Sequence, residues 1–311
     1  MSTAPTLSVN LGKLELANPI ILASGTVAYG EEYGRLYDLN RVGAIVVKGL
    51  SLQPRPGHPP PRLCETPSGL LNAIGLHNVG LKAFLADKLP FLRKHTIKVI
   101  VNIFGETTEE YVELATKLSQ AEGVHAIELN VSCPNTNKGG LSFGADLEAL
   151  TALVGEVRRA TPLPLIVKLS PNVTDIVPFA RVCEAQGADA VSLINTIRAM
   201  AIDVDTQRPK LSNVIGGLSG PAIRPIAVRM VWEVAKAVRL PIIGMGGIVT
   251  ADDALEFFLA GATAVAIGSA NFADPVTPVR ILKGLERYLT RRGLTDIRQV
   301  IGALKLDGIG D

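Results

Sequence analysis

The chain has 311 residues, of which 47% are hydrophobic, and this length suits two average domains or one large α/β barrel. Its formal net charge is only +2 and no block of Lys or Arg stands out, which argues against a nucleic-acid surface. The longest apolar runs are far shorter than the roughly 18 residues of a membrane span. We therefore expect a protein that binds neither nucleic acid nor membrane.

The start of the chain, MSTAPTLSVN, has neither a basic segment nor a long apolar one, so no secretory signal is expected. Cys64, Cys133 and Cys183 show no C-x-x-C spacing, and the four histidines show no paired spacing either. No metal site is therefore expected, and this chain alone cannot supply four thiolates to an iron–sulfur cluster. A reducing, cytoplasmic setting fits best.

The N-terminal segment and eight apolar runs predict the strands. Residues 6–18 alternate apolar and polar around a central glycine, which predicts a short β-hairpin that plugs one end of a barrel. A β-branched apolar run, a polar or glycine-rich loop and an amphipathic segment then recur. Such continuous apolar runs are typical of parallel strands covered on both faces. They lie at 19–24, 44–49, 98–103, 126–132, 165–170, 190–195, 241–247 and 264–269.

Helix signals lie between these runs. Thr107 with Glu110, and Thr250 with Asp253, predict capping boxes at two helix starts, and Gly261 is placed to end the second helix. Helices are expected at 79–94, 108–121, 146–160, 175–186, 222–238, 251–260 and 276–291.

Eight strands alternating with helices predict an α/β fold, a (β/α)8 TIM barrel with a short N-terminal β-hairpin. A doubly wound open sheet is the alternative, but no G-x-G-x-x-G motif opens the first crossover. No linker divides the chain, so residues 1–311 are expected to form a single domain. The long insertions 50–78 and 196–220 are expected to be elaborated loops at the C-terminal face of the barrel.

Polar residues gather where the predicted strands end, and this is the face where barrels carry their chemistry. Each one could be a structural residue satisfied by neighbouring carbonyls. Their convergence on one rim indicates a binding site instead, because polar groups in apolar runs are costly to bury unpaired. The residues at these strand ends, polar ones and glycines together, are Ser24, Lys48, Gly49, Asn102, Asn130, Lys168, Asn195, Thr196, Gly246, Gly247, Gly268 and Ser269.

The last two strands end in GMGG and IGSA, and the loops there are where barrels commonly bind phosphate. Gly246 and Gly247 would let the backbone approach an anion, although they could simply make tight turns. Lys168 adds a cation at the end of the fifth strand. A cation near the pyrimidine part of a flavin stabilises its anionic reduced form, so these features together suit a phosphorylated cofactor such as FMN.

Two further segments stay ambiguous from the residues alone. Cys133 follows Asn130 by three residues, and a thiol there could act as a base or be inert in a solvated loop. The segment NAIGLHN, residues 72–78, could reach back over the barrel mouth or form a surface turn.

These motifs resemble the class 1 dihydroorotate dehydrogenases, the FMN barrels of pyrimidine (UMP) biosynthesis, almost from end to end. The segments that match are ASGTVAYG, VVKGLS, NAIGLHN, VNIFG, ELNVSCPN, VKLSPN, LINTIRAMAIDVDTQRPKL, GGLSGPAIRPIA, IIGMGGI and AIGSA. The GGxxFGAD continuation after the cysteine and the DVDTQRPKL–GGLSG loop are similar to the NAD-linked class 1B catalytic subunits rather than to the fumarate-linked enzymes.

The resemblance implies that the chain oxidises (S)-dihydroorotate to orotate, with Cys133 as the catalytic base at carbon 5 and hydride passing from carbon 6 to FMN. The implied substrate-binding residues are Lys48, Asn72, Ile74, Gly75, Leu76, Asn130, Asn195 and Thr196. The implied FMN-binding residues are Ser24, Lys48, Gly49, Asn102, Asn130, Lys168, Ile194, Gly220, Gly246, Gly247, Gly268 and Ser269. Lys138, Gly139 and Gly140 would belong to the mobile loop that carries Cys133.

The resemblance also implies a single FMN in each chain, a homodimer, and a partner subunit with FAD and an iron–sulfur (2Fe-2S) cluster that delivers electrons to NAD+, giving a heterotetramer. The alternatives are a fumarate-linked class 1A-like enzyme and an FMN barrel that reduces another pyrimidine. From the residues alone, a lyase or isomerase acting on a phosphorylated substrate and a non-catalytic scaffold also stay open.

Overall fold

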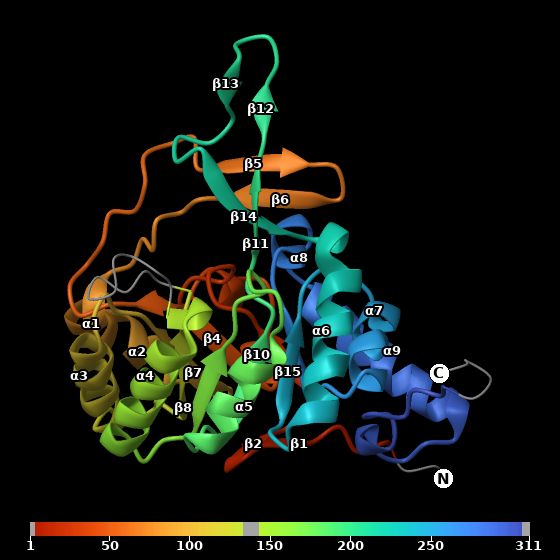
Figure 1. Cartoon of the computed structure of the whole chain (residues 1–311). Helices are drawn as coiled ribbons and strands as arrows, with labels where there is room; N and C mark the ends of the chain where they lie inside the picture. Colours follow the sequence, from red (N-terminus) through yellow and green to blue (C-terminus); the bar gives the residue numbers. More distant parts are fainter. Residues whose placement is uncertain (1–3, 133–142, 307–311) are drawn as a thin grey trace.

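The computed structural model describes residues 4–132 and 143–306. Eight parallel strands close into a barrel in the order β10-β15-β16-β3-β4-β7-β8-β9, which confirms the predicted TIM barrel (Figure 1). Nearly every residue of these strands is buried, because helices cover their outer faces and side chains fill the interior. The strands are β3 Ile20–Leu22, β4 Ala44–Leu50, β7 Lys98–Ile103, β8 Ala126–Asn130, β9 Leu165–Lys168, β10 Ala190–Leu193, β15 Ile242–Met245 and β16 Ala264–Ile267.

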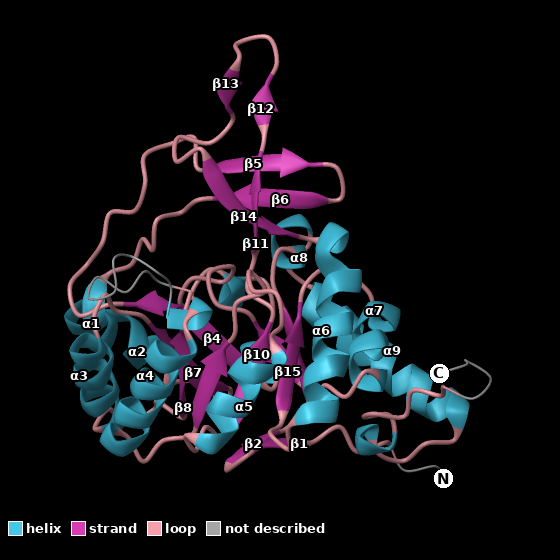
Figure 2. Ribbon diagram, in the orientation of Figure 1, coloured by secondary structure: helices cyan, strands magenta, loops and turns pink. Residues whose placement is uncertain are grey.

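Helices surround the barrel (Figure 2). Each longer helix buries one apolar face: in α3 the buried residues include Tyr111, Leu114, Ala115 and Leu118, which recur at helical spacing. The helices are α3 Thr108–Ser119, α4 Leu147–Ala160, α5 Val177–Ala185, α6 Arg224–Ala237, α7 Ala251–Leu259, α8 Ala270–Ala273 and α9 Thr277–Arg292. Short 3₁₀ turns lie at Tyr33–Arg35, Leu39–Arg41, Phe143–Ala145, Pro221–Ile223 and Ile297–Gln299.

The predicted helix at 79–94 is irregular. It is built from α1 Gly80–Ala83, a π turn at Phe84–Lys88 and α2 Leu89–Leu92. Pro90 lies in the first turn of α2, where its missing N–H cannot bond back into the preceding turn. The continuous α-helix expected from the apolar pattern is therefore replaced by three short pieces.

Of the two predicted capping boxes, only the second is complete. Thr250 and Asp253 bond reciprocally at the start of α7, as predicted. Thr107 accepts from the backbone N–H of Glu110, but the Glu110 carboxylate accepts from the N–H of Glu106 at 2.7 Å rather than from that of Thr107. The first predicted box was wrong in this half, because the turn before α3 brings the N–H of Glu106 to the carboxylate instead.

The predicted N-terminal hairpin is present as β1 Val9–Leu11 and β2 Leu14–Leu16. It lies at the end of the barrel opposite the raised sheet, which is the sheet formed by the insertions 50–78 and 196–220 (Figure 1). Its apolar residues are buried and its alternate residues are exposed. At the turn, a Cβ on Gly12 would lie 2.8 Å from the Cβ of Asp189, just before β10, so the hairpin packs closely against the bottom of the barrel.

The two long insertions form a sheet above the barrel mouth, rather than the separate loops that the sequence predicted. Four antiparallel strands pair in the order β11-β14-β6-β5, and the ribbon β12–β13 projects beyond them (Figure 1). Segments distant in sequence meet here, as in the pairing of Leu71 with Leu218. The strands are β5 Leu63–Thr66, β6 Gly69–Asn72, β11 Ile197–Met200, β12 Ile202–Asp203, β13 Arg208–Pro209 and β14 Ile215–Ser219.

This sheet has a small apolar cluster of its own, made of Leu71, Ala73 and Leu211, while the barrel and its helices share one extensive core. Across residues 4–132 and 143–306, no helix is both long enough and apolar enough to cross a bilayer.

Candidate active site

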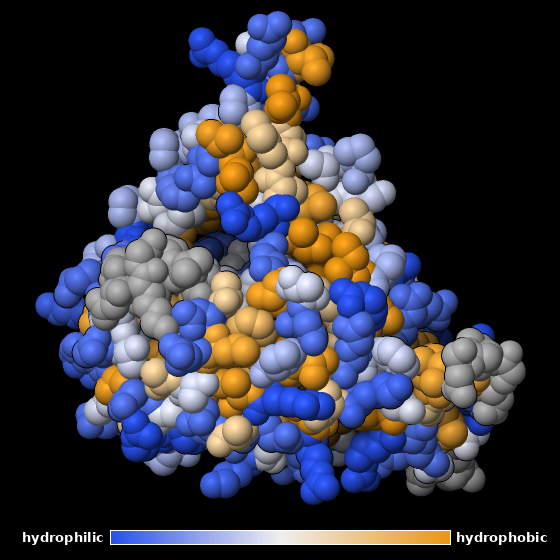
Figure 3. Space-filling view, viewed as in Figure 1, coloured by the Kyte–Doolittle hydropathy of each residue, from blue (hydrophilic) through white to orange (hydrophobic). Residues whose placement is uncertain are grey.

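A cavity of about 430 Å³ opens at the C-terminal mouth of the barrel, between the strand ends and the raised sheet. Figure 3 shows a hollow in this region of the surface. Every predicted site residue that the structure describes lines this cavity: Ser24, Lys48, Gly49, Asn72, Ile74, Gly75, Leu76, Asn102, Asn130, Lys168, Ile194, Asn195, Thr196, Gly220, Gly246, Gly247, Gly268 and Ser269. The predicted base, Cys133, and the loop residues Lys138, Gly139 and Gly140 lie outside the described residues.

Two lysines give the cavity its positive charge. Lys48 comes from β4, and Lys168 ends β9 with only 8% of its surface exposed. Among the described residues, neither ammonium group forms an ion pair with a carboxylate. Cations that are buried or partly buried without a counter-charge are costly, so this cavity is suited to anionic groups.

The surroundings of Lys48 also disfavour its protonated form. Burial lowers its pKa, and the nearby positive charges of Lys168 and Arg62 lower it further. A bound carboxylate would offset both effects, because it would supply a negative charge that favours the protonated lysine.

A second anion-binding feature lies on the other side of the mouth, where β15 and β16 end. The backbone N–H groups of Gly247, Ile248 and Ser269 have no hydrogen-bond acceptor among the described residues. Free N–H groups that converge at the ends of the last two barrel strands are the usual donors to a phosphate group. The structure therefore provides a neutral anion site in addition to the two lysines.

The chain packs too tightly here for any residue except glycine. Gly247 has a φ of +73°, and a Cβ on it would lie 2.7 Å from the carbonyl oxygen of Gly220. Gly220 has a φ of +99°, and a Cβ on it would lie 2.7 Å from the Cα of Gly69 at the start of β6. Both conformations and both contacts require glycine. These glycines join the end of β15 to the raised sheet.

Amide side chains define the middle of the cavity. Asn195 donates to Ser132 Oγ at 2.9 Å, and its carbonyl oxygen accepts from the N–H of Thr196 at 2.8 Å. The side-chain oxygen of Asn130 accepts from the N–H of Ser132 at 3.3 Å, and Tyr111 holds the backbone carbonyl of Asn130 at 2.7 Å. The ends of β8 and β10 are thus tied together by side chains directly before the segment that carries Cys133.

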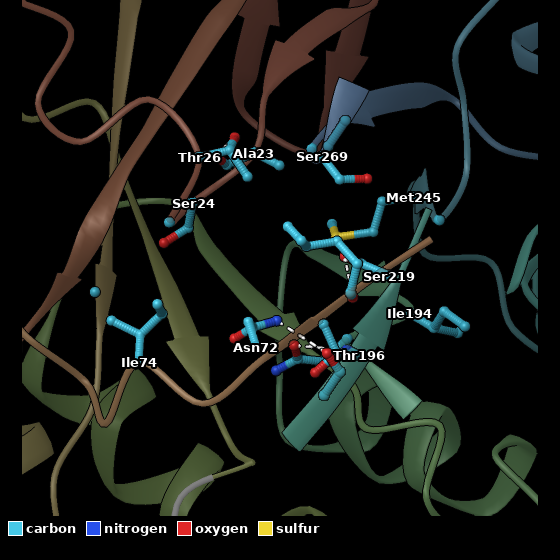
Figure 4. Close-up of a pocket in the computed structure, with 18 of the residues that line it drawn as sticks. Ala23, Ser24, Thr26, Asn72, Ile74, Ile194, Thr196, Ser219, Met245 and Ser269 are labelled. Carbon is cyan, nitrogen blue, oxygen red and sulfur yellow. Dashed lines mark hydrogen bonds between the residues drawn. The ribbon is translucent and has the colours of Figure 1, made fainter. Parts of the chain in front are cut away.

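The raised sheet supplies the opposite wall. Asn72, at the end of β6, donates to the carbonyl oxygen of Gly217 on β14 at 3.0 Å. Asn72 and Thr196 turn toward the same space, and Ser24, Thr26 and Ser269 lie across from them (Figure 4). A Cβ on Gly217 would lie 2.0 Å from Thr196 Oγ1, so β14 can lie against Thr196 only because this residue is glycine. The cavity is therefore closed between two independent parts of the fold.

Other lining residues were not predicted from the sequence. Ser132 was missed although it lies between Asn130 and Cys133 in a segment that was singled out. The remaining unpredicted members are mostly small or apolar and carry no chemical signal of their own, and several would give a flat ring an apolar surface. They include Ala23, Thr26, Ser219, Met245, Ile248, Ala266 and Phe272.

The two other cysteines lie apart from the cavity. Cys183 is fully buried in α5, and burial raises the pKa of its thiol above the usual range. Cys64 lies on β5 with its thiol near the carbonyl oxygen of Glu65 and does not line the cavity. Within the described part of the chain, no three His, Cys, Asp or Glu side chains are grouped to hold a metal ion.

Comparison with known proteins gives consistent results. The family model described as "Dihydroorotate dehydrogenase" matches residues 6–289. Relatives from Geotalea daltonii and Geobacter sulfurreducens are each 56% identical over 302 residues, and one from Trichlorobacter lovleyi is 55% identical over 301 residues. In each case the alignment covers 97% of this chain and 99% of the relative, and each relative is named dihydroorotate dehydrogenase B (NAD(+)), catalytic subunit. A barrel with a cationic cavity at its C-terminal mouth and a family match over nearly its whole length thus lead to one conclusion: this chain belongs to the dihydroorotate dehydrogenase family.

Proposed function

We propose that this chain is the catalytic subunit of an NAD+-linked dihydroorotate dehydrogenase and that it oxidises (S)-dihydroorotate to orotate in pyrimidine biosynthesis. The names of its relatives support the subclass. The observation that carries the proposal is the gathering of two unpaired lysines and a set of free backbone N–H groups around a single cavity in a member of this family. We propose further that residues 1–311 act as a single FMN-binding domain.

The residues of the cavity fit FMN. Gly246, Gly247, Gly268 and Ser269 would hold its phosphate with backbone N–H groups, while Lys168 would lie against the pyrimidine part of its ring system. Ser24, Gly49, Asn102, Ile194 and Gly220 would surround the rest of the molecule. When bound, FMN supplies a hydride acceptor.

The substrate would lie between the barrel and the raised sheet. Lys48 would pair with the carboxylate of dihydroorotate, which would offset the burial and the charge repulsion that lower the pKa of Lys48. Asn72, Asn130, Asn195 and Thr196 would hydrogen-bond the ring amides, and the segment from Ile74 to Leu76 would cover the ring. Closure by a sheet and a loop would exclude water from the reacting carbons.

We propose Cys133 as the general base that takes the proton from carbon 5. A thiol has an ordinary pKa of about 8.5, so only a few per cent is thiolate at neutral pH. Substrate oxidation should therefore become faster as the pH rises through the pKa of this thiol.

A partner subunit completes the reaction that we propose. This chain has too few cysteines for an iron–sulfur cluster, and its relatives are named as catalytic subunits. We therefore propose a homodimer of this chain bound to two cytoplasmic partner subunits that carry FAD and a 2Fe-2S cluster, giving a heterotetramer.

The central test uses the purified chain. The protein should be yellow and should release FMN on denaturation, and anaerobic addition of dihydroorotate should bleach the flavin absorbance. A colourless protein that cannot be reconstituted with FMN would contradict the proposal. Bleaching by another reduced pyrimidine but not by dihydroorotate would favour the alternative flavin enzyme.

The subclass needs a separate test with electron acceptors. Turnover with NAD+ should require a co-purified iron–sulfur flavoprotein, and fumarate should not support turnover by the isolated chain. Rapid turnover of the isolated chain with fumarate would assign it to the fumarate-linked subclass instead.

A further inference from the structure

A buried carboxylate lies directly beneath the cavity. Glu128, on β8, has 1% of its surface exposed and does not line the cavity. It faces into the barrel two residues before Asn130, on the same face of the strand, so it occupies the layer of side chains below the cavity floor. Burying a carboxylate at this depth costs free energy that an apolar residue would not cost, so the presence of Glu128 here needs an explanation.

Two side chains from other strands donate to this carboxylate. Asn102 on β7 donates from Nδ2 to one carboxylate oxygen at 2.6 Å, and Ser192 on β10 donates from Oγ to the other at 2.7 Å. Among the described residues, no cation pairs with Glu128. Both donors are themselves fully or almost fully buried, so water does not compete for these bonds. Of these three residues, only Asn102 reaches the cavity.

This arrangement decides which end of the Asn102 amide faces the cavity. An amide has an NH₂ group that only donates and an oxygen that only accepts, and a carboxylate oxygen is a partner for the NH₂ group alone. With Nδ2 held on Glu128, the Oδ1 atom lies on the opposite side, where a Cβ on Gly49 would be 2.8 Å from it. Gly49 itself lines the cavity, so Asn102 presents an acceptor to a bound ring.

We propose that Glu128 is a positioning residue for the cofactor: it fixes the Asn102 amide so that its oxygen accepts from a ring N–H of the flavin. This inference rests on the proposed binding of FMN. An oxidised flavin ring carries a single N–H, between two carbonyl groups of its pyrimidine part, and an amide free to turn over would often offer it an NH₂ group instead. A fixed oxygen avoids that donor–donor clash and needs no rearrangement when the flavin binds.

The neighbouring serine provides a matched control, because it contacts the same carboxylate but not the cavity. Ser192→Ala removes one donor to Glu128 and leaves the bond to Asn102 in place. Glu128→Gln keeps an acceptor for Asn102 and lets the Ser192 hydroxyl accept from the new amide. Both variants should keep the affinity of the apoprotein for FMN within about threefold, since neither releases Asn102.

The test is the dissociation constant of FMN with apoprotein, measured by quenching of flavin fluorescence, across a double-mutant cycle. Glu128→Ala and Asn102→Ala should each weaken binding by about tenfold, which is the loss expected for one buried hydrogen bond. The double variant should be no weaker than Asn102→Ala alone, because Glu128 would then have nothing to orient. Thermal unfolding of each apoprotein checks that it is folded, and Glu128→Met replaces the alanine variant if the void prevents folding.

Several outcomes would overturn the inference. Additive losses in the double variant would mean that Glu128 supports the barrel generally, and losses for Glu128→Gln as large as for Glu128→Ala would mean that its charge matters rather than its hydrogen bond. An unchanged FMN affinity in Glu128→Ala would also contradict it. A wild-type chain that binds no FMN would instead overturn the proposed function, and this inference with it.

Discussion

The two walls of the cavity differ in the direction and in the burial of their strands. The barrel strands are parallel, and β4 buries six of its seven residues, while in β5 of the raised sheet none is buried. The barrel is part of one extensive core, whereas the sheet depends on a small cluster around Leu71 and on a few hydrogen bonds such as that of Asn72. Regions with few buried contacts open at lower free-energy cost than a core does.

The two walls therefore differ in how easily they can move, and this difference fits two different tasks. The barrel holds its lysines and free N–H groups in fixed positions, which suits a cofactor that stays bound through every turnover. The sheet can shift at small cost, which suits a wall that must admit substrate and release product. We therefore expect substitutions in the barrel to affect FMN and substitutions in the sheet to affect dihydroorotate.

The largest effect should come from the proposed base, which follows the barrel strand β8. Cys133→Ser should bind FMN normally but slow its reduction by dihydroorotate by about 10²–10⁴-fold, the usual cost of losing a general base. Anaerobic stopped-flow absorbance measures this rate. Cys64→Ser, on the sheet and away from the cavity, should reduce as fast as wild type. Equal rates in both variants would remove Cys133 from the mechanism.

A smaller effect is expected for the barrel cation. Lys168→Met keeps much of the side-chain volume but removes the charge, and it should weaken FMN binding by about 10–100-fold, as expected for a charge-assisted hydrogen bond. Fluorescence titration of the apoprotein measures the change. The control is Lys236→Met, which alters an exposed lysine on α6 and should leave the affinity unchanged. Tight, fully reducible FMN in Lys168→Met would contradict the assignment.

On the sheet, Asn72→Ala should raise the KM for dihydroorotate by about tenfold and leave FMN affinity unchanged, because it removes one hydrogen-bonding side chain from the substrate wall. Steady-state kinetics together with FMN titration separates the two quantities. Asn213→Ala removes an exposed asparagine in the loop before β14 and should change neither. If Asn72→Ala instead released FMN, the division between barrel and sheet would be wrong.

The lowered pKa of Lys48 predicts that the stability of the FMN-free protein depends on pH. The pKa of Lys48 is lowered from 10.5 in the folded state, so between the lowered value and 10.5 the unfolded chain binds more protons than the folded one. Stability should therefore rise with pH across that interval. Urea unfolding at several pH values should show this rise in wild type and in the surface variant Lys82→Met, but a smaller rise in Lys48→Met. Identical pH profiles in all three would show that the pKa of Lys48 is not lowered.

The smallest effect is expected at the tip of the sheet. Val204 follows β12 and is 80% exposed, so Val204→Ser should change the free energy of unfolding of the isolated chain by less than about 0.5 kcal/mol. Urea denaturation measures the difference. A larger loss would mean that the projecting ribbon has a packing partner in the isolated protein and is not the loosely held end of the upper wall.

Much of the barrel could be predicted from the sequence because its signals are local. Runs such as AIVVKG and KVIVNI are continuous and apolar, and a strand covered on both faces requires that pattern. Lys168 and Gly247 could be placed on the rim once the strands were counted, because parallel barrel strands all end on the same side. Strand ends were less well predicted, since β8 stops at Asn130, where polar side chains begin to bond across the mouth.

The raised sheet could not be predicted in the same way. Asn72 bonds to Gly217, a residue 145 positions away in the chain, and no local pattern announces such a pairing. The insertions that form the sheet are rich in Pro and Gly, a composition shared by ordinary loops. The segment NAIGLHN was ambiguous for the same reason, and only its pairing with β14 places it over the cavity.

The sequence by itself therefore determined the barrel, the family and most of the residues that line the cavity, because hydrophobic periodicity and residue type are properties of neighbouring positions. The tertiary structure decided how those side chains are held. It placed Lys48 near two other cations, set Gly217 against Thr196, and buried Glu128 where it can orient Asn102. Such contacts depend on barrel closure and on strands that are distant in the chain, so they exist only once the whole fold has formed.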